Sequence, residues 1–332
     1  MRELLVGEEG AGQRLDKYLQ KYMSEAPKSF FYKMLRKKNI TCNRKKCDGS
    51  ERLSLGDKIQ LFLSEETIEG FRREISAGKK LPTTKLDILY EDSQVLLINK
   101  PAGMLSQRAE EKEPSLVEYL LGYLLASGQT TEEALRSFRP SVCNRLDRNT
   151  SGLVTAGKTQ AALRGLSALF KERTVRKYYL CLVRGKVEKE GRLNGWLLKD
   201  EKTNQVTICQ RDEEGAARIC TVYAPLSYGK DVTLLQVELI TGKTHQIRAH
   251  LAALGYPVIG DRKYGDGRWN RMYREKYGLT SQLLHAWRME FPALSGALLG
   301  LSEKTEEAPI PEVFQRVLRG EGILRNPERA GK

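Results

Sequence analysis

The chain has 332 residues, enough for about two domains with a sizeable core in at least one of them. Its 56 Lys and Arg outnumber its 42 Asp and Glu, which gives a net charge of +14 and a pI near 9.4. This excess favours a polyanionic partner, although a basic surface that only contacts solvent is an alternative. No run approaches about 18 consecutive apolar residues and no apolar signal segment follows Met1, so we expect a cytoplasmic protein with no membrane partner.

The six cysteines do not suggest a disulfide framework in a chain of this length, and we expect them to be free and reduced. Zinc would require paired clusters, and only three histidines could help to complete one. His245 and His250 are directed to different faces of a helix by their spacing, which argues against a shared metal ion. The GxSxG elbow and the Walker phosphate loop are absent from the sequence. We therefore expect no metal and no nucleotide cofactor.

Residues 1–68 are predicted to form a small, basic α/β domain. Apolar residues recur at helical spacing in its first half, and Pro27 separates the two helices that this spacing predicts. Alternating apolar residues near its end predict a strand with one buried face. The predicted elements are a helix buried through Leu15, Tyr18, Leu19 and Tyr22, a helix buried through Phe31, Met34 and Leu35, a strand at 40–42, a turn at 54–57, and a strand buried through Ile59, Leu61 and Leu63.

Eight cations fall within residues 28–46 of this domain, and no acid lies among them. An ordinary solvated helix face would intersperse acids with bases, so the run favours phosphate binding that depends on salt through counterion release. A solvated face remains the alternative. The predicted phosphate-binding residues are Lys28, Lys33, Arg36, Lys37, Lys38, Arg44, Lys45 and Lys46.

A polar stretch at 69–85 is a predicted linker, and residues 86–302 beyond it are rich in strand-like runs. These runs are grouped without a regular βαβ rhythm, with helical patterns at 161–170 and 245–254. We therefore expect an α+β fold with a mixed, largely antiparallel central sheet flanked by helices. Residues 303–332 are expected to form a charged, peripheral tail. The candidate strands are 88–90, 95–98, 178–183, 206–208 and 234–240.

Residues 144–152, NRLDRNTSG, place Asp147 between Arg145 and Arg148, ahead of a Thr-Ser-Gly turn. Asp is unfavourable inside helices and strands, so this pattern predicts an active-site loop, with a loop salt bridge as the alternative. Other chemistry-bearing segments are NKPAG at 99–103, the KYY that precedes a predicted strand at 177–179, TGKTHQIR at 241–248, and the basic loop GDRKYG at 260–265.

The segment TGKTHQIR is predicted to join a strand to a helix that is capped by Thr244. Ile247, Leu251 and Leu254 would form the buried stripe of this helix. His245 and Arg248 are three residues apart and would share another face.

Together these residue types suit an enzyme that modifies a base in RNA. A carboxylate can serve as a nucleophile or a general base, and a partner Arg favours its charged form. Extruding a base from its stack costs roughly a few kcal/mol, and an Arg can fill the gap that is left. An aromatic ring can then stack on the extruded base.

In these segments the chain resembles the RluA-type pseudouridine synthases, whose HRLDxxTSG signature is matched by NRLDRNTSG. Residues 14–63 resemble the small RNA-binding domain first seen in the small-subunit ribosomal protein S-four. The further matching landmarks, which follow the family's order over about residues 86–292, are NKPAG, KYYLCLVRG, TGKTHQIRAHL, GYPVIGDRKYG and LLHAWRMEF.

The resemblance implies isomerisation of uridine to pseudouridine, without a cofactor or a metal. Asp147 would be the catalytic carboxylate, attacking the ribose anomeric carbon or the uracil ring, or assisting glycosidic cleavage. Tyr179 would stack on the base and help to remove the proton on carbon 5, and its neighbour Tyr178 faces the other side of the strand. Arg248 would pair with Asp147, and Arg145 would enter the space vacated by the flipped nucleotide.

The sequence departs from the family at Asn144, where the signature has His. Asn cannot titrate near neutral pH, so we assign this position no acid–base role and expect activity to survive. The expected substrate is large-subunit ribosomal RNA, because the added basic domain would supply phosphate contacts outside the active site. Transfer RNA is the alternative substrate, and a non-catalytic RNA-binding or ribosome-assembly protein is the alternative of another class. A monomer is expected.

Overall fold

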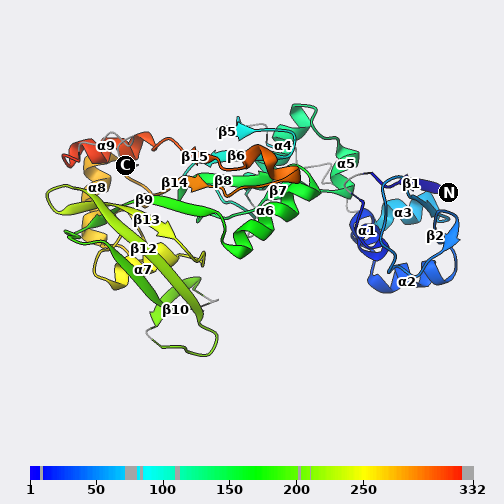
Figure 1. Cartoon of the computed structure of the whole chain (residues 1–332), viewed down its shortest axis with the longest axis horizontal. Coiled ribbons are helices and arrows are strands. Elements are labelled where there is room, and N and C mark those ends of the chain that lie inside the picture. The colour runs from blue at the N-terminus through cyan, green and yellow to red at the C-terminus, as the bar shows by residue number, and fades with distance from the viewer. Residues whose placement is uncertain are drawn as a thin grey trace. The chain divides into compact units, whose positions relative to one another are not determined.

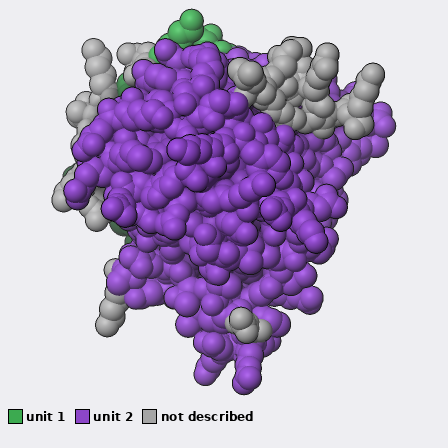
Figure 2. All heavy atoms as spheres, turned by 90° about the vertical axis from the view of Figure 1, so that its left-hand side faces the viewer, with its two compact units in different colours: residues 1–85, 117–141, 158–163 green, residues 86–116, 142–157, 164–332 purple. Residues whose placement is uncertain are grey.

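The computed structural model describes residues 1–7, 10–71, 81–82, 85–108, 113–200, 203–209 and 211–323. The chain divides into two compact units (Figure 2): unit 1 contains residues 1–85, 117–141 and 158–163, and unit 2 contains the remainder. Much of the predicted linker, and the predicted tail from residue 324 onward, lie outside the described residues. Within the described ranges, no helix is both long and apolar enough to span a bilayer.

The N-terminal part of unit 1 contains a small antiparallel sheet and helices around one apolar core (Figure 1). The apolar helical face predicted from Leu15 to Tyr22 is confirmed, since all four of its residues are buried. Met34 and Leu63 are only partly buried, and Leu63 lies beyond the end of its strand. The strand order is β1-β4-β2-β3, and the elements are β1 (Arg2–Leu5), α1 (Leu15–Tyr22), α2 (Lys28–Arg36), β2 (Ile40–Cys42), β3 (Lys45–Lys46), β4 (Lys58–Leu61) and α3 (Glu65–Phe71).

The main sheet has eleven strands in the part of the chain that is described, and along its main path it is antiparallel except for one parallel pair, β8 with β14. This arrangement confirms the expected mixed, largely antiparallel sheet of an α+β fold. Its main path is β11-β10-β12-β13-β9-β14-β8-β6-β5. The strands are β5 (Ile88–Glu91), β6 (Val95–Lys100), β7 (Ser141–Val142), β8 (Ser151–Gly157), β9 (Arg176–Arg184), β10 (Gly191–Asp200), β11 (Gln205–Cys209), β12 (Ala217–Tyr228), β13 (Val232–Leu239), β14 (Leu284–Glu290) and β15 (Thr305–Glu307).

Helices of unit 2 pack against this sheet through apolar side chains. Tyr273 of α8 and Phe314 of α9 lie in one core cluster with residues of β9 and β13, and Ala249 of α7 packs against β10 to β12. The remaining helices of the chain are α4 (Leu116–Ala126), α5 (Glu132–Ser137), α6 (Gln160–Glu172), α7 (Gln246–Ala253), α8 (Gly267–Tyr277), the short 3-10 helix η1 (Gly296–Leu301) and α9 (Glu312–Gly320).

The chain beyond Glu303 is not a peripheral tail as far as residue 323. Strand β15 pairs with β14, and α9 buries Phe314, Val317 and Leu318 in the core of unit 2. Apolar residues at helical spacing on α9 bury this segment despite its high charge. The expectation of a peripheral segment is therefore wrong for β15 and α9.

Gly152 explains how the NRLDRNTSG loop meets the sheet. Its φ is +112°, and a Cβ at this position would lie 2.1 Å from the carbonyl oxygen of Ala286. Glycine alone permits both this backbone conformation and this approach to β14. The Thr-Ser-Gly turn thus allows β8 to start in register with β14, directly after the loop that carries Asp147.

Candidate active site

A cleft of about 800 Å³ in unit 2 contains the four residues that the resemblance singled out, Arg145, Asp147, Tyr179 and Arg248. They come from three places: the loop before β8, strand β9 and helix α7. The sheet order brings β8 and β9 to either side of β14, which explains why segments distant in sequence meet here. Basic side chains at the cleft include Arg108, Lys199, Lys243, Arg262 and Lys263.

Arg248 links two carboxylates at the base of the cleft. Its Nη1 donates to Oδ2 of Asp147 over 2.7 Å, while its Nε and Nη2 donate to the two oxygens of Asp261 over 2.7 and 2.8 Å. Asp261 is completely buried, Arg248 is 6% exposed and Asp147 is 24% exposed. Only Asp147 therefore combines a fixed guanidinium partner with access from the cleft.

The electrostatics of this group favour a charged Arg248 and a charged Asp261. Burial disfavours the guanidinium ion, but the hydrogen bonds and charges of Asp261 and Asp147 outweigh burial and raise the pKa of Arg248. Burial would likewise raise the pKa of Asp261, but Arg248 and the backbone N–H groups of Lys263 and Tyr264 lower it below its usual range. Asp261 thus binds Arg248 through a bidentate pair of hydrogen bonds, and Nη1 of Arg248 remains available to donate to Asp147.

Lys100 of the NKPAG segment is hydrogen-bonded to the backbone of the Asp147 loop. Its buried Nζ donates to the carbonyl oxygens of Pro101, Met104 and Arg148 over 2.8, 2.9 and 3.1 Å. Burial lowers the pKa of Lys100 to about 7, although the charge of Asp147 acts to raise it. The backbone N–H of Gly103 also donates to the carbonyl of Arg148. These bonds fix the loop backbone one residue beyond Asp147.

Asn144 fastens the other side of this loop to β8. Its Oδ1 accepts hydrogen bonds from the backbone N–H and the hydroxyl of Thr155, and its Nδ2 donates to the carbonyl of Leu153. These are contacts that an amide can make without titrating. Arg148, to which the sequence assigned no role, forms an exposed ion pair with Glu113 over 2.7 Å.

Tyr179 and Tyr178 point to opposite faces of β9, as strand geometry requires. Tyr179 lines the cleft, whereas Tyr178 lies in the core cluster with α8 and α9 and is within 3.4 Å of Glu290. Burial, reinforced by the negative charge of Asp147, raises the pKa of Tyr179 well above its usual range. The phenol is therefore protonated at neutral pH.

Helix α7 begins one residue later than predicted. Its N-cap is His245, with φ of +55° in the left-handed region, and not Thr244. This backbone turn points the His245 ring toward the cleft, with Nε2 4.0 Å from Oδ2 of Asp147 and Nδ1 3.0 Å from the hydroxyl of Tyr264. Burial lowers the pKa of His245. Leu254, predicted in the buried stripe of the helix, is 40% exposed because it is the C-cap.

Sequence reasoning missed Asp261, Tyr264 and the structural role of Lys100. The GDRKYG and NKPAG segments were singled out, but no residue in them was matched to a partner. One signal was available: Asp261 is the only acid in a segment that directly follows the apolar run PVIG, where burial is expected. Its partner Arg248 could not be deduced without the fold.

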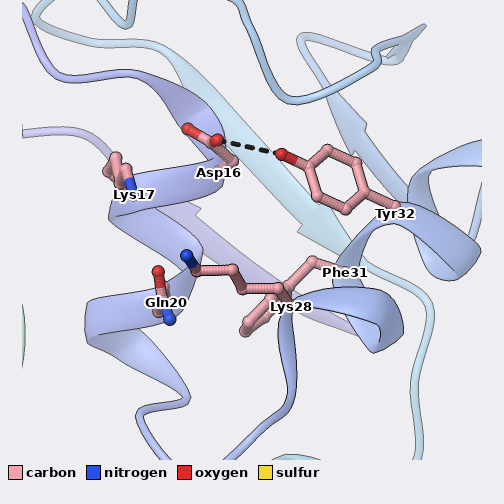
Figure 3. Close-up of a pocket in the computed structure, with 6 residues that line it drawn as sticks. All are labelled: Asp16, Lys17, Gln20, Lys28, Phe31 and Tyr32. Atoms are coloured by element: carbon pink, nitrogen blue, oxygen red, sulfur yellow. Dashed lines mark hydrogen bonds between the residues drawn. The ribbon is translucent and has the colours of Figure 1, made fainter.

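The eight predicted phosphate-binding cations of unit 1 all have exposed side chains. They are carried by α2, by the loop that follows it, and by the segment around β3. Lys28 also borders a small groove between α1 and α2 (Figure 3), where the hydroxyl of Tyr32 donates to Asp16 over 3.2 Å. Among the described residues, no group of three or more His, Cys, Asp or Glu is arranged to hold a metal ion.

Comparison with known proteins gives a consistent result. Residues 94–253 match the family model described as RNA pseudouridylate synthase. The chain is 32% identical to the ribosomal large subunit pseudouridine synthase C of Vibrio parahaemolyticus, over 95% of each chain, and 29% identical to the protein of that name in Escherichia coli, over 93% of each. Among solved structures, human RNA pseudouridylate synthase domain containing 4 superposes with a TM-score of 0.56 at 23% identity, covering 70% of this chain and 91% of that one, which shows a shared fold.

Proposed function

Because the chain belongs to the RNA pseudouridylate synthase family, we propose that it isomerises uridine to pseudouridine in large-subunit ribosomal RNA. The observation that carries the proposal is the pairing of Asp147 with Arg248 in a cleft that also contains Tyr179. The substrate is inferred from relatives named for the large ribosomal subunit, which align along nearly their whole length. We infer that the enzyme acts as a monomer in the cytoplasm.

Asp147 is the catalytic carboxylate in this proposal. Arg248 binds its Oδ2, and among the described residues no hydrogen bond occupies Oδ1, so Oδ1 is the oxygen available to the substrate. The bond between N1 of uracil and the ribose anomeric carbon breaks, with Oδ1 attacking that carbon or the uracil ring or assisting the cleavage. The uracil turns, and carbon 5 bonds to the anomeric carbon as any bond formed by Oδ1 breaks. The carbon 5 proton passes to water, and N1 takes up a proton from water. No atom is gained or lost overall, and no cofactor is required.

Tyr179 contributes its ring and its protonated hydroxyl. A raised pKa makes the phenolate scarce at neutral pH, so the hydroxyl acts as a hydrogen-bond donor to the turning base while the ring stacks on it. Its role in losing the carbon 5 proton is therefore to position the base and not to accept the proton as a free phenolate.

Arg145 is assigned to the gap left by the flipped nucleotide. It is exposed, lies at the cleft two residues before Asp147, and can extend into a duplex without breaking a contact in the site. Residues 1–68 are proposed to form an S-four-type RNA-binding domain, joined by a linker at 69–85 to a catalytic domain that starts at 86. Its eight exposed cations would bind phosphates outside the active site.

The proposal is tested by tritium release from transcripts labelled at uridine carbon 5. We expect the protein to release tritium from large-subunit ribosomal RNA and not from transfer RNA. Release from transfer RNA alone would contradict the substrate assignment. Tight binding to ribosomal RNA without release from either transcript would favour the non-catalytic alternative.

A further inference from the structure

Helix α8 carries an exposed row of arginines that the reaction does not use. Arg268, Arg271 and Arg274 are exposed and recur every three residues, so they lie on neighbouring parts of one helix face over about 9 Å. None of the three forms an ion pair with a described residue. The opposite face of α8 buries Tyr273 and Tyr277 in the core, so the arginines project outward.

The acids around α8 do not neutralise this row. Asp266 caps the helix by accepting from the backbone N–H groups of Arg268 and Trp269, and its carboxylate also binds Arg184. Glu321 pairs with Lys276. Glu275 is the one acid within the helix; it is exposed and lies on the same face, four residues after Arg271, so three arginines against one acid leave this face with a net charge of +2. The exposed face therefore presents a net positive charge.

Two structural links connect α8 to the catalytic cleft. Arg262 and Lys263 line the cleft, and α8 starts four residues after Lys263, so the basic surface continues from the cleft onto the helix. In addition, the Asn270 side chain accepts from the N–H of Gly260 and donates to the carbonyl of Asp261 over 2.8 and 2.7 Å. The helix is thus anchored to the same loop that holds Arg248.

We propose that the exposed face of α8 binds the phosphate backbone of the RNA substrate where the strand leaves the cleft. Charge complementarity identifies the occupant as a polyanion, and continuity with the cleft identifies that polyanion as the RNA being modified. This identification rests on the proposed function.

The test replaces Arg268→Gln, Arg271→Gln and Arg274→Gln together in the full chain. Binding to a large-subunit ribosomal RNA transcript is measured over a range of salt concentrations. We expect Kd to rise at least about tenfold and the slope of log Kd against log salt to fall by about two to three units, one for each lost phosphate contact. The single-turnover rate at saturating RNA should be unchanged. The matched control, Arg→Lys at the same three positions, keeps the charge and should bind within about twofold of wild type.

Two results would overturn the proposal. One is a glutamine variant with the wild-type Kd and salt slope. The other is a lysine variant as defective as the glutamine variant, because charge would then not be the cause. Tritium release by the wild-type protein is measured in parallel. If the wild type releases none while the glutamine variant still loses binding, the proposed function fails and the RNA-binding surface stands.

Discussion

Arg248 donates a 2.7 Å hydrogen bond to Asp147 across 101 residues of sequence. The guanidinium of Arg248 is buried and the carboxylate of Asp147 is open to the cleft, so Arg248 is held in place while Asp147 can react with a substrate. Asp261 makes this possible, because its bidentate contact with Arg248 satisfies the donors that Asp147 does not use. Asp261, Arg248 and Asp147 are thus linked in series, and of the three only Asp147 is open to the cleft, where it can contact a substrate.

Replacing Asp261→Asn should weaken both stability and activity. The change leaves the buried Arg248 with one carboxylate in place of two, and breaking a buried pair costs about 3–5 kcal/mol. We expect the urea midpoint to fall by a corresponding amount and the single-turnover rate to fall by about 10²-fold, because Arg248 is no longer held toward Asp147. Glu113→Gln removes a pair exposed to solvent and should cost less than about 1 kcal/mol. Equal stability losses in the two variants would refute this account of Asp261.

Replacing Tyr179→Phe should separate catalysis from binding. The variant keeps the stacking ring and loses the hydroxyl, so we expect the rate to fall by about 10²- to 10⁴-fold while Kd for RNA changes little. Because burial raises the pKa of Tyr179, the wild-type rate should show no phenol titration at or below the ordinary tyrosine pKa near 10. Tyr178→Phe, on the other face of β9, should retain activity. A fully active Tyr179→Phe would remove the hydroxyl from the mechanism.

Much of the site could be predicted from the sequence, because its residues lie in short segments with a family resemblance. Asp147, Tyr179, Arg248 and Arg145 do meet in one cleft. Asp261 could not be assigned a role, since the sequence gives no indication that its partner is an arginine 13 residues earlier. The helix N-cap was misassigned because Thr244 has the usual capping side chain, while the left-handed backbone at His245 depends on the packing around it.

The fold class was predicted correctly, but two of the longest strands were not identified. Strand β10 contains Gly191 and Gly195, and β12 contains Pro225 beside a register shift, all of which are unfavourable for strands taken alone. Both strands form because each pairs along its length with strands that are near it in the chain, β10 with β11 and β12, and β12 with β13. Hydrogen bonding to paired strands on both sides thus outweighs the unfavourable residues within each strand. Helix α9 differs, because its apolar residues do recur at helical spacing, and it was missed because the high charge of the segment suggested a peripheral tail.

Neutralising part of the basic stretch in unit 1 should weaken RNA binding without affecting chemistry. We choose Arg36→Gln, Lys45→Gln and Lys46→Gln, three exposed cations from α2 and β3. The salt slope should fall by roughly one unit per lost phosphate contact, and the rate at saturating RNA should be unchanged. Arg36→Lys with Lys45→Arg and Lys46→Arg is the charge-retaining control. An unchanged slope in the glutamine variant would mean that this stretch faces solvent in the complex.

Stability should decline as the pH falls through the range in which buried histidines would titrate. Burial lowers the pKa of both His250 and His285 from 6.5 to about 4. Between these values the unfolded chain binds more protons than the folded one, so the free energy of unfolding falls as the pH drops from 6.5 to about 4. Each histidine contributes on the order of 3 kcal/mol over this range.

His250→Asn tests this pH dependence. Asn can keep a hydrogen-bonding atom toward Thr221, where His250 Nδ1 lies 3.0 Å from the hydroxyl, and it does not titrate. The urea midpoint of the variant should fall less steeply than that of wild type from pH 6.5 to about 4. Parallel curves for the two proteins would show that His250 does not contribute to the acid sensitivity.

The most direct test of the central claim compares wild type with Asp147→Asn in tritium release from large-subunit ribosomal RNA labelled at uridine carbon 5. Asn preserves the size of the side chain and removes its charge, and RNA binding is measured on the same samples. The account predicts release by wild type, no detectable release by the variant, and similar Kd values for both. Equal release by the two proteins would contradict Asp147 as the catalytic carboxylate.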